Sequence, residues 1–434
     1  MTHVCRYWRE SVISAPENWT RISSQLIGLA KLSLERSKSA PLELWLDVRQ
    51  AGVTPEFFDL VKPHIQNAKA LGVDSDSVED EFTETLQNFL PSIRNLRSLY
   101  LRGGGDNAPS ERFNDPCGHL TSSLTYLYLF EIPLHPSFLQ LRTLTDFTLH
   151  NHQFNLHLDT LLDFLKENRS LEYATLDVRF TQTSLRNSRR RGPIKNRLQN
   201  LSVSSTSTMD IKALISKIAV QKGAHLEVSH FKQNTGSTLI SFLISTNHLL
   251  NLRSSTFMEY CPNGRRVRTV RLLGPNGSFS LTRWLGSEAL FLELPLFPLN
   301  EIRTFYLNHP PNFGPHHVTP TAFPPLFFPA LETLAIEREP AISYLLSLFF
   351  SNLSSSPSLK TLAFLDCGID DRFMEELTRF SSNHKNLHRV IIVNSRGHLP
   401  PSPSIDELGK HVPVVDVSVG KELPSDLKWN GPLG

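Results

Sequence analysis

Apolar residues return at a regular spacing along most of the chain. The recurring pattern is L-x-x-L-x-L with conservative replacements, as in NLRSLYL, where Leu96, Leu99 and Leu101 are the apolar positions. The first positions of the copies are Leu96, Leu124, Leu144, Leu171 and Leu198 in one run, and Ile302, Leu331, Leu359 and Leu387 in a second. Successive copies within a run lie 20 to 29 residues apart, which is the range of leucine-rich repeats.

Each copy predicts a short strand that cannot bury its apolar side chains alone. Full burial of one such side chain contributes about 1.5–3 kcal/mol, so neighbouring copies are expected to stack, with parallel strands about 4.8 Å apart. The segments between them predict amphipathic helices, for example in LDTLLDFLKEN and in DDRFMEELTRF, where Asp370 is a suitable N-cap. The predicted fold is therefore α/β: an irregular leucine-rich-repeat solenoid, a horseshoe with its parallel sheet on the concave face and its helices on the convex face.

The pattern is weaker between residues 205 and 300. Three segments there, GAHLEV, LLNLRS and VRTVRL, are interpreted as degenerate copies, with apolar positions at Leu226, Val228, Leu249, Leu252, Val267, Val270 and Leu272. AKALGV lies one spacing ahead of Leu96 and is interpreted as the first copy, which gives about twelve or thirteen repeats. Regular repeats also carry Asn or Cys three residues after the last apolar strand position, and only Cys367 fits. Uneven loops are expected.

The side chains that alternate with the leucines predict a binding surface. Neighbouring strand residues point to opposite faces of a sheet, so one face of four adjacent copies carries five aromatic residues: Tyr100, Tyr126, Tyr128, Phe130 and Tyr173. Such a cluster has the composition of a protein-binding hot spot. The alternative interpretation is that a tail or a long insert covers these rings as core.

Composition restricts the class of protein. The 434 residues are 40% hydrophobic and 20% charged, with a net charge of +2, which is typical of a globular chain and disfavours nucleic acid as a partner. The cysteines Cys5, Cys117, Cys261 and Cys367 are far apart and predict free thiols. No apolar stretch is long enough to span a bilayer, and no signal peptide is recognised. The sequence predicts an intracellular protein of the cytoplasm, the nucleus or both, without membrane contact or cofactor.

Local motifs add no catalytic site. The basic run RNSRRRGPIKNR could be an import signal or a phosphate-binding loop, but a solvated insert is the simpler interpretation. A metal site at His150, His152 and His157 is disfavoured, because their spacing fits no metalloenzyme motif. DSDSVEDEFTET has Glu79 where a calcium loop demands glycine; Ser77 and Asp80 fit a helix-capping box better. No nucleotide-binding, zinc-protease or nucleophile-elbow motif occurs, so an enzyme is not predicted.

The N-terminal residues resemble a known module. In MTHVCRYWRESVISAPENW, Val4, Cys5, Trp8 and Val12 form one stripe of an amphipathic helix, followed by Trp19. The V-C-R-x-W-R core, the A-P-x-x-W turn and the later L-E-R-S-x-S-A-P-L segment together resemble the end of an F-box and its junction in fungal F-box proteins with leucine-rich-repeat tails. The resemblance covers about 48 residues in detail. It implies an F-box remnant at 1–25, in which these five residues pack; a junction helix and strand at 26–67; a solenoid at 68–394; and a cap or tail at 395–434.

This resemblance also implies a function. In that family the F-box docks on a Skp-type adaptor of a cullin–RING ubiquitin ligase, and the repeats hold a protein substrate. The earlier F-box helices have no counterpart in this sequence, so adaptor binding is expected only if they are encoded upstream of Met1. The alternative is a ligase-independent repeat scaffold that binds a protein partner.

Overall fold

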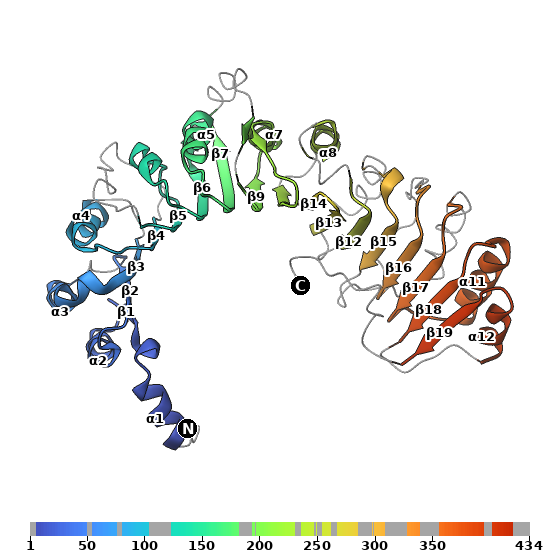
Figure 1. Ribbon diagram of the computed structural model, residues 1–434, viewed down its shortest axis with the longest axis horizontal. Coiled ribbons are helices and arrows are strands. Elements are labelled where there is room, and N and C mark those ends of the chain that lie inside the picture. The colour runs from blue at the N-terminus through green and yellow to red at the C-terminus, as the bar shows by residue number, and fades with distance from the viewer. Residues whose placement is uncertain are drawn as a thin grey trace. The chain divides into compact units, whose positions relative to one another are not determined.

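The computed structural model divides the chain into two compact units (Figure 1). Unit 1 comprises residues 1–205 and 213–221, and unit 2 comprises residues 206–212 and 222–434. The structure describes residues 6–49, 54–75, 80–103, 123–181, 193–195, 197–230, 236–246, 249, 254–261, 267–284, 297, 299–308, 328–338, 356–394 and 402–419. Seventeen strands of these residues belong to a mostly parallel β-sheet, which confirms the α/β class and the parallel sheet expected of stacked repeats.

Unit 1 contains a run of parallel strands in chain order. Each strand pairs in parallel with the next. The strands are β1 (Arg21–Ser23), β2 (Leu42–Asp47), β3 (Ala68–Asp74), β4 (Ser98–Arg102), β5 (Tyr126–Phe130), β6 (Asp146–Leu156), β7 (Tyr173–Phe180) and β9 (Asn200–Ser205). A separate parallel pair joins β8 (Ile194–Lys195) to β10 (Ile218–Ala219). The parallel ladder therefore begins at β1 and β2, ahead of the predicted first repeat.

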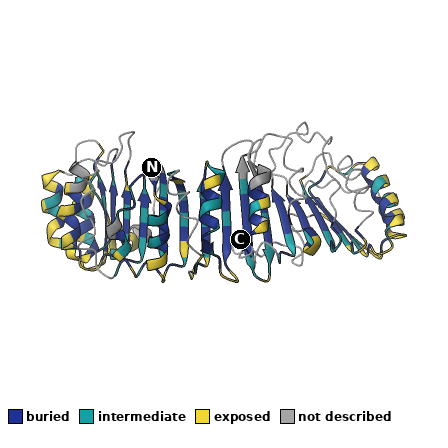
Figure 2. Ribbon diagram, turned by 90° about the horizontal axis from the view of Figure 1, so that it is seen from above, coloured by how far each residue is buried: buried dark blue, intermediate teal, exposed yellow. Residues whose placement is uncertain are grey.

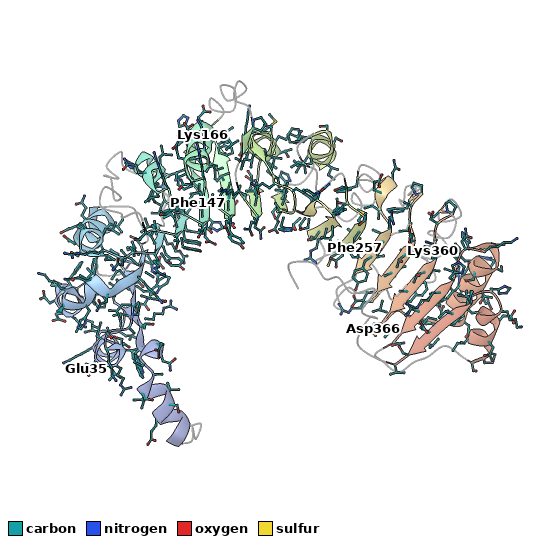
Figure 3. The ribbon with its side chains drawn as sticks, in the orientation of Figure 1. Glu35, Phe147, Lys166, Phe257, Lys360 and Asp366 are labelled. Atoms are coloured by element: carbon teal, nitrogen blue, oxygen red, sulfur yellow. The ribbon has the colours of Figure 1, made fainter. Side chains whose placement is uncertain are left out.

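The repeat leucines of unit 1 align across the strands and face the helices. Leu99, Leu127 and Phe147 lie in register and are almost completely buried. Phe147, labelled in Figure 3, packs on Phe164 of α5 with 4.3 Å between the ring centroids. The helices are α1 (Arg6–Ser14), α2 (Ile27–Ser37), α3 (Pro55–Val61), α4 (Asp80–Phe89) and α5 (Leu158–Glu167), with 3-10 turns at Pro16–Trp19, Lys62–Asn67, Leu90–Ser92 and Pro136–Gln140. We call this side of the strands the leucine face.

The N-terminal segment of unit 1 is only partly packed. Trp19 donates its indole N–H to the carbonyl of Val12 (3.1 Å), and the guanidinium of Arg36 lies 4.4 Å from the Trp19 ring. Val12 itself is 43% exposed in the described part of the chain, so the packing expected for its side chain stays a prediction. Val4, Cys5 and the side chain of Trp8 lie outside the described residues.

Unit 2 continues the parallel arrangement in its second half. Its strands are β11 (His225–His230), β12 (Phe257–Cys261), β13 (Val267–Gly274), β14 (Gly277–Trp284), β15 (Thr304–Asn308), β16 (Thr333–Glu337), β17 (Thr361–Leu365), β18 (Arg389–Val393) and β19 (Val414–Ser418). From β12 through β15 to β19, each strand in this order pairs in parallel with the next. Its helices are α8 (Gly236–Ser245), α11 (Asp371–Asn383) and α12 (Ser402–Gly409), with a 3-10 turn at Leu299–Glu301; α7 (Thr208–Ile215) lies across the division between the units. The segment expected to be a cap or tail thus contains a helix and one more parallel strand.

The weak middle of the pattern is not a simple series of repeats. β13 pairs antiparallel with both β12 and β14, so the interpretation of Val267, Val270 and Leu272 as a repeat is wrong. The hairpin is inserted so that β14 pairs in parallel with β11, whereas β12 pairs in parallel with β15. In LLNLRS, Leu249 is fully buried and Leu252 lies outside the described residues; the next described strand, β12, begins at Phe257. GAHLEV does form a parallel strand, β11, with Leu226 and Val228 fully buried.

Backbone groups at the ends of the strands find hydrogen-bond partners in two ways. Cys367 is buried, and its thiol donates to the carbonyls of Ile336 (3.4 Å) and Leu365 (3.3 Å), which confirms its expected role. Elsewhere, Glu131 and Asp366 follow their strands with φ of +50°, and each donates its backbone N–H to the next strand, at 2.7 and 2.8 Å. Each of these residues, in the left-handed conformation, thus adds one hydrogen bond to the strand pairing before the chain leaves the sheet. Cys261 and Cys367 are buried thiols, not disulfide-bonded, as expected, while Cys5 and Cys117 lie outside the described residues.

The predicted N-cap of α11 offers a direct stability test. The carboxylate of Asp370 accepts a hydrogen bond from the backbone N–H of Phe373 (2.7 Å), the arrangement expected from the sequence. Asp370→Ala is expected to lower the free energy of unfolding by about 1 kcal/mol, because one terminal N–H loses its acceptor. Chemical denaturation measures this change, and Asp370→Ser should retain most of the stability. Equal losses for Ala and Ser would contradict a capping role.

A buried histidine makes the stability of unit 2 depend on pH. His225 is 8% exposed, and its Nδ1 lies 2.6 Å from the hydroxyl of Ser278. Burial lowers its pKa below the ordinary value; Arg271 lowers it further, and Glu227 opposes the shift. The unfolded state therefore binds more protons than the folded state. The contribution of neutral His225 to the free energy of unfolding is complete above about pH 6.5 and is lost as the pH falls below that value. Denaturation between pH 5 and pH 8 should show a smaller pH dependence for His225→Asn, whereas the same change at exposed His411 should leave the wild-type dependence.

Candidate functional site

The predicted aromatic residues lie together on the side of the unit 1 sheet opposite the leucine face. Burial alternates along β5, where the leucines are buried and the tyrosines are half-buried; Figure 2 shows this alternation of dark blue and teal along the strands. The Tyr100 ring lies 4.9 Å from that of Tyr126 and 6.1 Å from that of Tyr128. We call this surface, formed by Trp45, Tyr100, Tyr126, Tyr128, Phe130 and Tyr173, the aromatic face.

Phe130 and Tyr173 lie at the margins of the aromatic face. The guanidinium of Arg102 lies 5.1 Å from the Phe130 ring, and the imidazole of His150 lies 5.7 Å from it. Tyr173 is 43% exposed and aligns with Asp146 of the neighbouring strand. The five residues selected by alternation therefore lie on β4, β5 and β7 and form one surface, on which the rings differ in their solvent exposure.

The sequence prediction missed Trp45. Its ring lies 5.2 Å from that of Tyr100, with the guanidinium of Arg21 4.7 Å from its centroid. The intervening residue in the register is Gly72, where a Cβ atom would come within 2.4 Å of the indole. Glycine therefore lets the indole cross β3 and reach Tyr100. The alternation of leucines with Trp45 in LELWLD was the signal that could have identified it.

Ion pairs line one margin of the aromatic face. Arg49 contacts the carboxylates of Asp47 (2.7 Å) and Asp74 (3.6 Å), and Arg102 lies 3.8 Å from Asp74. Hydrogen bonds from the Arg49 side chain hold the pKa of Asp47 well below its ordinary value. Burial raises the pKa values of Tyr100 and Tyr128. These phenols stay protonated at neutral pH and offer O–H donors beside apolar rings, a combination suited to protein recognition.

His150 lies on this face beside a carboxylate. Its Nδ1 lies 3.5 Å from the carboxylate of Asp177, and its ring lies 5.8 Å from that of Tyr128. His157 is exposed at the start of α5, and the side chain of His152 lies outside the described residues. Within the described ranges, no group of three or more His, Cys, Asp or Glu side chains is arranged to hold a metal ion.

The corresponding face of unit 2 is closed. Residues at the same strand positions form a buried cluster of Tyr306, Ala335, Ala363, Leu365, Ile391 and Val393, with Phe257 packed against it (labelled in Figure 3). Both faces of β16, β17 and β18 are therefore core. An open aromatic face is a property of unit 1.

A groove of about 620 Å³ lies between α11 and α12 of unit 2. Its lining includes the polar side chains Asp371, Glu375, Thr378, Glu407 and His411. Glu407 of this lining forms an exposed ion pair with Lys410, three residues further along the chain. The groove is remote in sequence from every predicted site residue, and exposed pairs of this kind contribute little specificity.

The remaining sequence motifs fall largely outside the described residues. Of the basic run, the side chain of Arg197 is described, and it is exposed. Ser77 of the predicted capping box is not described, although α4 does begin at Asp80. Gly103 extends the ladder by donating its N–H to the carbonyl of Phe130 (2.9 Å), and the two glycines after it lie outside the described ranges.

Comparisons with known proteins leave the family of the chain open. No family model matches the sequence, and no curated protein matches it significantly. None of the helices described is both long and apolar enough to cross a membrane.

Proposed function

We propose that the protein is the substrate-recognition subunit of a Skp/cullin-type ubiquitin ligase and binds a target protein through its repeat region. The observation that carries this proposal is the aromatic face, where six rings gather beside paired charges. Aromatic and arginine side chains dominate the binding energy of protein interfaces. In this proposal the repeats build a leucine-rich-repeat solenoid, with the aromatic face on the concave side of the sheet and the helices on its convex side.

The N-terminal segment supports the link to an adaptor. Besides Val12, the exposed apolar side chains include Ile13 (41%), Leu26 (59%) and Leu29 (51%). Their exposure is unfavourable in water, and additional F-box helices would cover such residues. Residues 1–25 would then be the last part of the F-box, with Trp19 and Arg36 joining it to α2.

The proposed role requires no catalytic group in this chain. A receptor holds its target close to a ubiquitin-loaded enzyme, so a bimolecular encounter becomes a local one with a high effective concentration. The expected partners are a Skp-type adaptor and a protein substrate, in the cytoplasm, the nucleus or both. A ligase-independent scaffold would use the same aromatic face without the adaptor.

Co-purification with the adaptor tests the proposal. Translation of the genomic DNA upstream of Met1 should reveal an in-frame segment for the earlier F-box helices, and the extended chain should co-elute with a Skp-type adaptor. An extended chain that does not bind the adaptor would contradict the receptor function and favour the scaffold.

Capture of the target tests the aromatic face separately. Tyr126→Ala combined with Tyr128→Ala removes two rings and is expected to weaken partner capture from a lysate by at least tenfold, since hot-spot truncations cost about 2 kcal/mol or more. Quantitative pull-down measures this change, with Lys166→Ala on α5 as the control. Unchanged capture by the double variant would remove the aromatic face from the proposal.

A further inference from the structure

We propose that Tyr126, Asp146 and Tyr173 form a clamp for a single arginine side chain of the bound protein. This inference rests on the proposed function only in that a protein occupies the aromatic face. The three residues lie in one register row, on the adjacent strands β5, β6 and β7. The carboxylate therefore stands between two phenol rings.

The spacing of the row fits a guanidinium group. Adjacent strands lie about 4.8 Å apart, so the two tyrosines are attached about 10 Å apart. In the neighbouring register row, Tyr128 of β5 aligns with Thr148 of β6 and Thr175 of β7. The two threonine side chains are small and leave room beside Asp146. A planar cation that enters between the rings can lie against their faces while it binds the carboxylate.

Asp146 differs from the other carboxylates on this side of the sheet in its charge environment. Each of the others lies near a basic side chain. Glu43 lies 3.4 Å from Lys69, and Asp47 lies 2.7 Å from Arg49. Asp74 lies 3.6 Å from Arg49 and 3.8 Å from Arg102, and Asp177 lies 3.5 Å from His150. The Asp146 carboxylate instead accepts a hydrogen bond from the hydroxyl of Thr145 (2.6 Å). In the described part of the chain, no basic side chain lies within ion-pair distance of it. The negative charge is therefore available for a cation from the partner.

Arginine fits the clamp better than other side chains. Its planar, weakly hydrated guanidinium stacks on aromatic rings and binds carboxylates through two parallel N–H groups, whereas the lysine ammonium is a compact and strongly hydrated charge. An acidic side chain would meet the like charge of Asp146 and is excluded. The clamp thus specifies one position of the target sequence.

Peptide pools provide the test. Fluorescent nine-residue peptides, randomised except for a fixed central arginine, lysine, citrulline or glutamate, are titrated against the whole chain. The arginine pool should bind about tenfold more tightly than the citrulline pool, which is a neutral analogue of similar shape. Asp146→Asn should reduce this preference to about twofold or less. Glu43→Gln, which removes the same charge from the same register row, should leave it intact.

A second variant guards against misfolding of the first. Tyr173→Leu alters an exposed ring and should weaken binding of the arginine pool about fivefold, with an unchanged melting temperature. The clamp is overturned if the arginine and citrulline pools bind equally, or if Glu43→Gln and Asp146→Asn weaken binding to the same extent. Adaptor co-purification is a separate readout. If the chain binds the adaptor but does not prefer arginine, the clamp is wrong and the receptor function stands. If it prefers arginine but does not bind the adaptor, the clamp stands in a ligase-independent scaffold.

Discussion

Phe364→Ala is expected to lower the free energy of unfolding of unit 2 by about 3–5 kcal/mol. Phe364 lies on the leucine face of β17, is fully buried, and meets the ring of Phe373 from α11 edge to face at 5.0 Å and 89°. Its neighbours in the register are Ile336 and Ile392, both fully buried. Alanine would leave a cavity among side chains that strands and a helix hold in place, so little relaxation can offset the loss.

Chemical denaturation measures this loss, and hydrogen exchange locates it. In a stacked repeat each strand depends mainly on its neighbours, so amides of β16, β17 and β18 should lose the most protection. Val414→Ala is the control, because Val414 is 45% exposed and its truncation should change stability by about 0.5 kcal/mol or less. A loss below about 1 kcal/mol for Phe364→Ala would contradict the packing described here.

The regular repeats could be predicted from the sequence because each carries its own evidence. Leu99, Leu127 and Leu149 occur in local patterns whose meaning does not depend on distant residues, and their strands pair as the pattern requires. The strand β12 was missed because its buried residues, Met258, Glu259, Tyr260 and Cys261, do not resemble a leucine pattern. Burial selects for shape and satisfied polar groups as well as for apolar character.

The direction of β13 could not be derived from its alternation. Parallel and antiparallel strands share a period of two, so Val270 and Leu272 fit either arrangement. The turn GPNG after β13 was the available signal, because a two-residue loop containing asparagine and followed by glycine favours an antiparallel hairpin. The local pattern therefore predicts the strand itself, whereas the turn predicts that it pairs antiparallel with the next strand.

The candidate site was predicted only in part for a similar reason. Alternation placed Tyr100 and Tyr128 on one face, and their ring contacts follow from the register. Trp45 was missed because it belongs to a strand assigned to the junction, and its contact with Tyr100 depends on the absence of a side chain at Gly72. The open face of unit 1 and the closed face of unit 2 likewise reflect what each face packs against, which strand periodicity alone does not encode.

Gly277→Ala is expected to cost about 2–4 kcal/mol, because it disturbs the inserted hairpin in two ways. Gly277 begins β14 with φ of +116°, a backbone conformation that costs a residue with a side chain about 1–2 kcal/mol. A Cβ atom there would also come within 2.2 Å of the carbonyl oxygen of Ala224, which adds the cost of overpacking. The next residue, Ser278, donates its N–H to that same oxygen at 3.1 Å, so the clash would displace the strand pairing of β14 with β11.

Gly223→Ala is the matched control for this prediction. Gly223 also has a positive φ, +88°, but a Cβ atom added to it meets nothing within 4 Å. Alanine should therefore cost about 1–2 kcal/mol there, from the backbone alone. Denaturation of both variants separates the two effects, and hydrogen exchange should show lost protection in β14 for Gly277→Ala only. Equal costs at the two glycines would mean that the close approach to Ala224 does not constrain the hairpin, and that β14 is free to shift along β11.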